Sequence, residues 1–193
     1  MKKLFGICLS FFFYFPFIQA QHTEFGVKAG YNAASISVED GADYDSKSGI
    51  HIGALAHIHV SSHFAVQPEL VYSSQGGQSG NTKLKLGYIN VPVLAQYMIN
   101  EGFRLQTGPQ FGFLVSAKQK IGDLEVDVDD AFNSVDISWA IGAGYIFTSG
   151  LGIDARYNIG LSNISDDSNN SVKNRVFQVG LFYQFHQHSG KKK

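Results

Sequence analysis

Residues 136–161 read DISWAIGAGYIFTSGLGIDARYNIGL, and this stretch decides the fold. Apolar side chains occupy every second position on both sides of Thr148-Ser149-Gly150. Because successive side chains of a β-strand point to opposite faces, the alternation predicts two strands, each with one apolar face. The three residues between them are enough for a tight turn. The stretch therefore predicts an antiparallel hairpin whose two faces have different surroundings.

The same alternation recurs along the chain. The segments that carry it are 25–32, 50–60, 63–73, 86–99, 103–116, 136–147, 151–161 and 175–185. Short gaps (61–62, 100–102 and 148–150) alternate with long polar gaps (39–48, 74–85, 117–135 and 162–174). Up-and-down barrels of outer membranes have this layout, with short periplasmic turns and longer outside loops. The pattern predicts an all-β fold: an eight-stranded antiparallel transmembrane β-barrel with both termini in the periplasm.

The N-terminus has the features of a secretory signal peptide. Lys2 and Lys3 precede an apolar run, and Ala20 is a small residue suited to cleavage. We therefore expect a signal peptide at residues 1–20, the barrel at 21–185 and a polar, basic tail at 186–193. The single cysteine, Cys8, lies within the predicted signal peptide, so the mature chain has no thiol and no disulfide.

Charge and composition exclude one class of partner. The formal net charge is −1, and removal of the two lysines at positions 2 and 3 makes it −3. The sequence has no basic stripe, so nucleic acid is not an expected partner. The chain contains 21 Gly, 16 Phe and 9 Tyr but a single Trp, a composition typical of β-structure rather than of helices.

The two predicted faces differ in chemistry. One face is apolar, and Ile52, Val91 and Ile141 are typical of it. The other face carries polar and charged residues: Lys28, Asn32, His51, His57, His59, Gln67, Glu69, Asn90, Gln96, Arg104, Gln106, Gln110, Asp136, Ser138, Asp154, Arg156, Asn158, Gln178 and Gln184. A charge on a lipid-facing strand position costs about 2–4 kcal/mol at the midplane, so we expect the apolar face to point outward into lipid.

Aromatic residues and prolines mark particular places on these strands. Aromatic side chains near the short turns predict one interfacial girdle: Phe25, Phe64, Tyr97, Phe103, Tyr145, Phe147, Tyr183 and Phe185. Tyr31, Tyr72 and Phe113 are candidates for the other girdle. Pro68, Pro92 and Pro109 fall inside predicted strands, where proline removes a hydrogen-bond donor. We expect bulges or breaks in strand pairing near them.

Several of these segments resemble the PorT-like outer-membrane β-barrel family of Bacteroidetes-type bacteria. The resemblance is carried by residues 25–33, 67–73, 88–94, 107–118, 136–145 and 154–161, in that order and spacing. It extends over nearly the whole mature chain. It implies an outer-membrane location and a small barrel of the OmpA/OmpX-like architecture, and it implies no particular activity.

The charges of the polar face have two interpretations. Lys28, Arg104 and Arg156 are matched in number by Glu69, Asp136 and Asp154. The interior of an eight-stranded barrel is just wide enough for side chains, and an unpaired buried charge is costly. We expect these six to form a paired plug. A gated proton or ion path through them is the alternative.

Other candidate sites are weaker. His57 and His59 share a face, with His51 above them, His63 in the turn below and Glu69 on the neighbouring strand, a possible metal site. We expect them instead to be polar residues that fill the lumen, with no metal and no cofactor. The acids Glu39, Asp40, Asp43, Asp45, Asp123, Glu125, Asp127, Asp129, Asp130, Asp166 and Asp167 lie in the long gaps. These gaps lack the spacing of a calcium loop, and no catalytic constellation is evident, so we expect no enzyme.

Three functional hypotheses remain open from the sequence. The first is a small closed outer-membrane barrel with a structural or surface-interaction role carried by its loops. The second is a narrow channel or a component of an envelope transport or secretion assembly. The third is a soluble lipocalin-like ligand-binding barrel. The expected partners are outer-membrane lipid, lipopolysaccharide and the barrel assembly machinery, and an envelope protein is a further candidate.

Overall fold

The computed structural model describes residues 23–38, 44–100, 102–122, 124–165 and 171–185. The elements, in order, are β1 (Thr23–Val38), β2 (Tyr44–His59), β3 (Phe64–Ser79), β4 (Thr82–Met98), β5 (Phe103–Ile121), β6 (Leu124–Asp127), the 3₁₀ helix η2 (Asp129–Ala131), β7 (Val135–Ile146), β8 (Leu151–Gly160) and β9 (Val172–Gln184). Among these residues, no helix has the length and apolar character needed to cross a membrane. The predicted signal peptide (1–20) and basic tail (186–193) lie outside the described residues and stay predictions.

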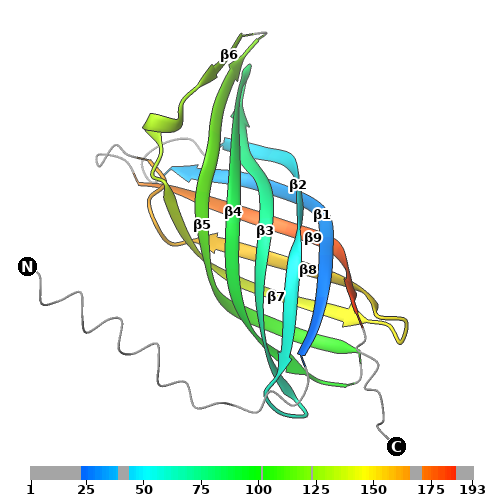
Figure 1. The fold of residues 1–193 in the computed structure, drawn as a ribbon. Helices are drawn as coiled ribbons and strands as arrows, with labels where there is room; N and C mark the ends of the chain where they lie inside the picture. The colour runs from blue at the N-terminus through cyan, green and yellow to red at the C-terminus, as the bar shows by residue number, and fades with distance from the viewer. Residues whose placement is uncertain (1–22, 39–43, 101, 123, 166–170, 186–193) are drawn as a thin grey trace, which may run out of the picture.

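The strands close on themselves. They form one antiparallel sheet in the order β4-β3-β2-β1-β9-β8-β7-β5-β6, and β4 also pairs with β5. β6 pairs only with β5, so the remaining eight strands make the closed barrel that the alternation predicts. β1 and β9 pair from Gly26–Gln184 to Val38–Val172, which joins the two ends of the described chain (Figure 1). Closure leaves no unpaired edge along the barrel wall.

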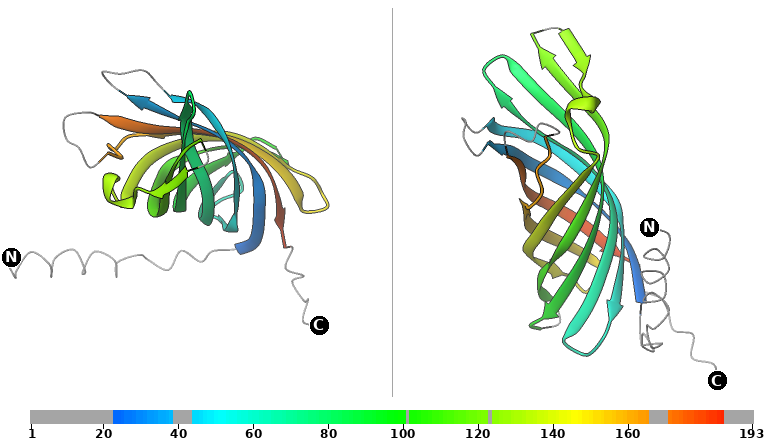
Figure 2. Two further views of the ribbon diagram at one scale, coloured as in Figure 1. Left: turned by 90° about the horizontal axis from the view of Figure 1, so that it is seen from above. Right: turned by 90° about the vertical axis from the view of Figure 1, so that its left-hand side faces the viewer.

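The long gaps are shorter than predicted, because strands continue into them. β3 and β4 run to Ser79 and from Thr82, so residues 74–85 form a hairpin with a tight turn rather than a loop. Gly80 has φ 55° in this turn, a conformation that favours glycine. β5 and β6 form a second hairpin within residues 117–135, and β2 and β9 begin at Tyr44 and Val172. Figure 2 shows the two hairpins projecting beyond the other strands at the same end.

The faces point as predicted. Every residue of the predicted polar face is buried inside the barrel except His59, which is partly exposed. The opposite face is outward, with Ile52 59% and Ile141 53% exposed and Val91 partly exposed. The inner face is less uniformly polar than predicted, because Leu55, Leu94 and Phe182 are also buried on it.

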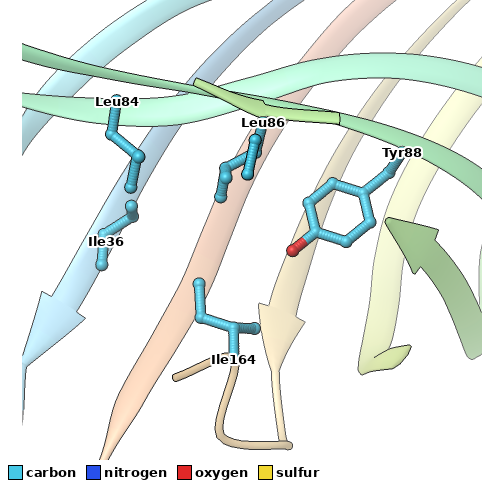
Figure 3. Packing of buried hydrophobic residues seen from close by; sticks show 6 residues of the cluster. Ile36, Leu84, Leu86, Tyr88 and Ile164 are labelled. Atoms are coloured by element: carbon cyan, nitrogen blue, oxygen red, sulfur yellow. The ribbon is translucent and has the colours of Figure 1, made fainter. Parts of the chain in front are cut away.

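An apolar cluster closes the interior at the end of the long connections. Leu84, Leu86 and Tyr88 from β4 meet Ile36 from β1, Ile164 from the segment after β8, and Ala117 from β5 (Figure 3). We call these six residues the apolar cap. A bulge where Gly87 and Tyr88 of β4 face Ser116 and Leu114 of β5 shifts the register just beneath it.

The aromatic and proline predictions agree with the structure. The predicted girdle residues near the short turns are outward and exposed, apart from the partly exposed Phe103. Strand pairing is interrupted between Pro68–Val93 and Val71–Asn90, and again between Pro92–Gln110 and Ala95–Thr107. The second interruption includes Pro109. Because proline lacks an N–H group, a break at these positions leaves no donor unsatisfied on the proline itself.

Candidate functional site

Four buried charges form an ion cluster in the middle of the barrel. Arg156 on β8 donates from Nη1 and Nη2 to the Glu69 carboxylate on β3, at 3.0 and 2.9 Å. Lys28 on β1 donates to Asp154 at 2.9 Å and lies 3.4 Å from Glu69. Arg156 also donates to Asp154, at 3.3 Å. We call Lys28, Glu69, Asp154 and Arg156 the ion cluster. Two cations and two anions are joined across the lumen, so the cluster is neutral.

The prediction that six charges form one paired plug is therefore wrong for two of them. Asp136 is buried near the apolar cap end and accepts a hydrogen bond from Ser162 at 2.8 Å. Arg104 is buried near the short turns, where it donates to Gln184 at 3.4 Å and lies over the Phe182 ring. Neither residue is part of the ion cluster. The alternation gives the face of each charge but not its height in the barrel.

A neutral polar layer lies next to the ion cluster. Asn32 accepts hydrogen bonds from His51 at 2.7 Å and Gln178 at 3.0 Å. Its own amide donates to Ser73 at 2.9 Å, and Asn158 donates to Gln178 at 3.0 Å. These side chains come from five neighbouring strands, β8, β9, β1, β2 and β3. The hydrogen bonds therefore link one side of the barrel wall from within, whereas the ion cluster spans the lumen.

The histidines do not assemble a metal site. The His57 and His59 rings are 4.6 Å apart in an edge-to-face arrangement, while His51 is hydrogen-bonded to Asn32. Glu69, the carboxylate considered beside the histidines, is held by Arg156 and Lys28. Within the part of the chain that the structure describes, no three His, Cys, Asp or Glu residues are placed to hold a metal ion.

The projecting hairpins form a small sheet of mixed charge rather than an acidic loop. Lys85 lies 2.6 Å from Glu125, and Lys118 lies 3.4 Å from Glu125 and 3.8 Å from Asp127. Ionic hydrogen bonding and attraction from Lys85 lower the pKa of Glu125 below its ordinary value. The acids at 39–43, 123 and 166–167 lie outside the described residues.

The other face of these hairpins is apolar. Strand pairing places Gln119, Val126, Ile121 and Leu124 on the same face as Leu84 and Leu86 of the apolar cap. Ile121, Leu124 and Val126 are 54%, 75% and 58% exposed. We call residues 74–79, 82–87, 117–121 and 124–127 the projecting sheet. The sequence signal was present, since 83–86 and 124–127 alternate Lys-Leu-Lys-Leu and Leu-Glu-Val-Asp.

One protein-family model matches most of the chain. The outer membrane protein beta-barrel domain family matches residues 19–166. The chain belongs to this family. It is a small outer-membrane β-barrel, and the apolar outward face and charged interior are what such a barrel requires. A soluble lipocalin-like barrel, the third hypothesis from the sequence, has the opposite arrangement and is excluded.

Solved structures show the same fold at low sequence identity. Neisserial surface protein A (NspA) is 15% identical, with a TM-score of 0.61, over 85% of this chain and 99% of that chain. Ail, the attachment invasion locus protein of Yersinia pestis, is 16% identical, with a TM-score of 0.56, over 85% of this chain and 99% of that chain. Comparison with curated proteins gives no significant match. The narrower PorT-like resemblance stays a prediction.

Proposed function

We propose that this protein is a closed, non-conducting outer-membrane barrel that presents the projecting sheet at the cell surface for contact with a partner. The ion cluster is the observation that supports closure. The bidentate contact between Arg156 and Glu69 joins opposite walls, and Lys28 and Asp154 fill the space beside it. The apolar cap then covers the interior at one end. The two groups lie in series along the lumen, and this arrangement supports a barrel without a continuous polar path.

The projecting sheet supports the surface role. It extends the barrel by two hairpins. One face of these hairpins is apolar and exposed, and the opposite face carries the ion pairs of Lys85 with Glu125 and of Lys118 with Asp127. Exposed apolar side chains on a rigid sheet are suited to protein contact. Ail, whose name describes attachment and invasion, shows that a barrel of this fold is compatible with such a role. No catalytic activity is part of the proposal.

We further propose that the projecting sheet lies outside the cell and that both termini lie in the periplasm. The outward girdle aromatics then contact the lipid interface, and lipopolysaccharide surrounds the upper strands. Introduced cysteines test this orientation, because the only native cysteine lies within the predicted signal peptide. A membrane-impermeant maleimide should label Asn81→Cys, in the β3–β4 turn, in intact cells. Ser62→Cys, in the β2–β3 turn, should be labelled only after the outer membrane is permeabilised. The reverse pattern would contradict the orientation.

Closure is tested by conductance. The purified barrel in a planar bilayer should give no stable open state, whereas a narrow channel or transport component would give reproducible single-channel steps. Replacing both Lys28 and Arg156 with Ala removes the cations of the ion cluster, and replacing Leu86 with Ala thins the apolar cap. Steps from the native protein would overturn the proposal in favour of the channel.

A further inference from the structure

The end of the barrel near the short turns holds a pocket that the proposed function does not use. The pocket has a volume of about 300 Å³ and is lined by Glu24, His57, His59, Arg104, Tyr145 and Gln184, among others. We call it the mouth pocket. It lies on the other side of the ion cluster from the apolar cap, between the starts of β1 and β5 and the ends of β2 and β9.

Arg104 is the exceptional residue in this pocket. It is only 5% exposed, yet its Nε and Nη1 atoms have no hydrogen-bond partner among the described residues. Its contacts are the 3.4 Å hydrogen bond to Gln184 and the Phe182 ring, whose centre is 5.3 Å from the guanidinium carbon. Arg156, equally buried, has two carboxylates in contact. Glu24 and Asp154 attract the Arg104 charge from a distance, but they do not satisfy its Nε and Nη1 donors. Buried guanidinium donors without a partner are costly, because they are taken from water.

Other unpartnered polar atoms share the mouth pocket. Gln184 Nε2 is a buried donor with no partner, and His57 Nδ1 is buried and unpartnered as well. Glu24 is partly exposed at the pocket and has contacts of its own. The pocket therefore places the Arg104 charge and unpartnered donors beside a space large enough for a small ligand, with the Glu24 carboxylate also in its lining.

We propose that the mouth pocket binds a small oxyanion, a carboxylate or phosphate group, held by Arg104 with Gln184 and His57 beside it. The guanidinium fork matches two oxygens of such a group, and charge-assisted hydrogen bonds of this kind are about twice as strong as neutral ones. The Phe182 ring packs against one side of the guanidinium group. The inference is independent of the surface role, since it concerns the opposite end of the barrel.

Phosphate titration tests the proposal. Barrel purified in a non-ionic maltoside detergent is titrated with inorganic phosphate and, separately, with acetate, and heat of binding is measured. We expect saturable binding of at least one anion. Arg104→Gln should weaken it about tenfold or more, because charge and fork are both lost. Arg175→Gln, which removes an exposed arginine on β9, is the matched control and should bind like the native protein.

The outcomes that overturn the proposal are distinct. Absence of binding of both anions to the native barrel would exclude the site, as would unchanged binding in Arg104→Gln. Should Arg104→Gln not fold, as shown by loss of heat-modifiable migration in gels, Arg104→Lys retains the charge without the fork. It should still bind, but more weakly than the native barrel, and equal affinity would contradict the assigned role of the guanidinium.

The same chemistry can come from a lipid headgroup or from a free anion. Repeating the titration in nanodiscs of phosphatidylglycerol separates these sources. If a headgroup phosphate occupies the mouth pocket, the binding seen in detergent should be competed away. If the ligand is a free anion, the affinity should be the same in both. Either result supports an oxyanion site and identifies whether the ligand is a lipid headgroup or a free anion.

Discussion

Arg156 and Glu69 join opposite walls of the barrel through two hydrogen bonds of 3.0 and 2.9 Å. Three strands separate β3 from β8 either way round the barrel: β2, β1 and β9 in one direction, and β4, β5 and β7 in the other. The contact is therefore a cross-brace rather than a pair between neighbouring strands. With Lys28 and Asp154 it forms a compact neutral unit that occupies the lumen and holds the wall in shape.

Removing one charge of this unit should be costly. Glu69→Gln leaves two cations facing one anion in the ion cluster, and breaking a buried pair in this way costs about 3–5 kcal/mol. We expect the free energy of unfolding, measured by urea titration in lipid vesicles, to fall by that order. Glu125→Gln, an equally conservative change in the projecting sheet, should leave it close to the native value, because ion pairs in contact with water contribute little.

Charge balance, rather than the lost hydrogen bonds alone, should explain the effect. The double change Glu69→Gln with Lys28→Gln leaves Arg156 paired with Asp154 at 3.3 Å. We expect this double variant to be more stable than Glu69→Gln alone. If the losses of unfolding free energy caused by Glu69→Gln and by Lys28→Gln simply add in the double variant, the ion cluster does not act as a unit.

The outward apolar face should be sensitive to charge at the depth of lipid. Ile141 lies near the middle of β7 and is 53% exposed. Ile141→Arg should lower the free energy of unfolding in vesicles by about 2–4 kcal/mol. Leu124→Arg is the matched control, because Leu124 is still more exposed but lies in β6, outside the closed barrel. A similar loss in both variants would contradict the membrane placement of β7.

The alternation of side chains predicted the faces of the strands better than their lengths. Ile52 and Glu69 lie on the sides that their positions indicate, because one face must avoid charge and the other must enclose it. The polar residues of the projecting sheet predict solvated loops, whereas the structure has strands there. Above a membrane both faces of a strand are free to carry polar groups, so Lys83 and Lys85 do not end β4.

The site was predictable only in part for a geometric reason. Period-two alternation assigns Arg104, Asp136 and Arg156 to the lumen. It does not predict which residues of two strands that are not neighbours lie at the same height. Arg156 and Glu69 are 87 residues apart and meet through strand tilt and stagger. Arg104 and Asp136 lie at the starts of β5 and β7, and because these two strands are antiparallel neighbours the two residues are at opposite ends, where they cannot pair.

Acid should loosen the projecting sheet. Hydrogen bonding and attraction from Lys85 lower the pKa of Glu125 below its ordinary value of 4.5. The stabilisation is therefore complete above pH 4.5 and is lost as the pH falls through the lowered pKa. The Glu125 carboxyl carbon, followed by NMR, should titrate below pH 4.5, and Lys85→Gln should raise the midpoint. Lys173→Gln, a change at an exposed position on β9, should leave the Glu125 midpoint unaltered. If Lys85→Gln also leaves the midpoint unaltered, the pairing of Lys85 with Glu125 is excluded.

The wall beside the mouth pocket has no room for a side chain at position 152. A Cβ atom on Gly152 would lie 2.2 Å from Cζ of the Phe182 ring, which packs against Arg104. Gly152→Ala must displace the ring, and overpacking of this kind costs about 1–3 kcal/mol. Phe182→Leu removes the obstacle but leaves space behind the guanidinium. In a double-mutant cycle of unfolding free energies, Gly152→Ala should therefore cost less in the Phe182→Leu background than in the native one. Additive losses would mean that the strand backbone, and not the Phe182 ring, requires glycine at position 152.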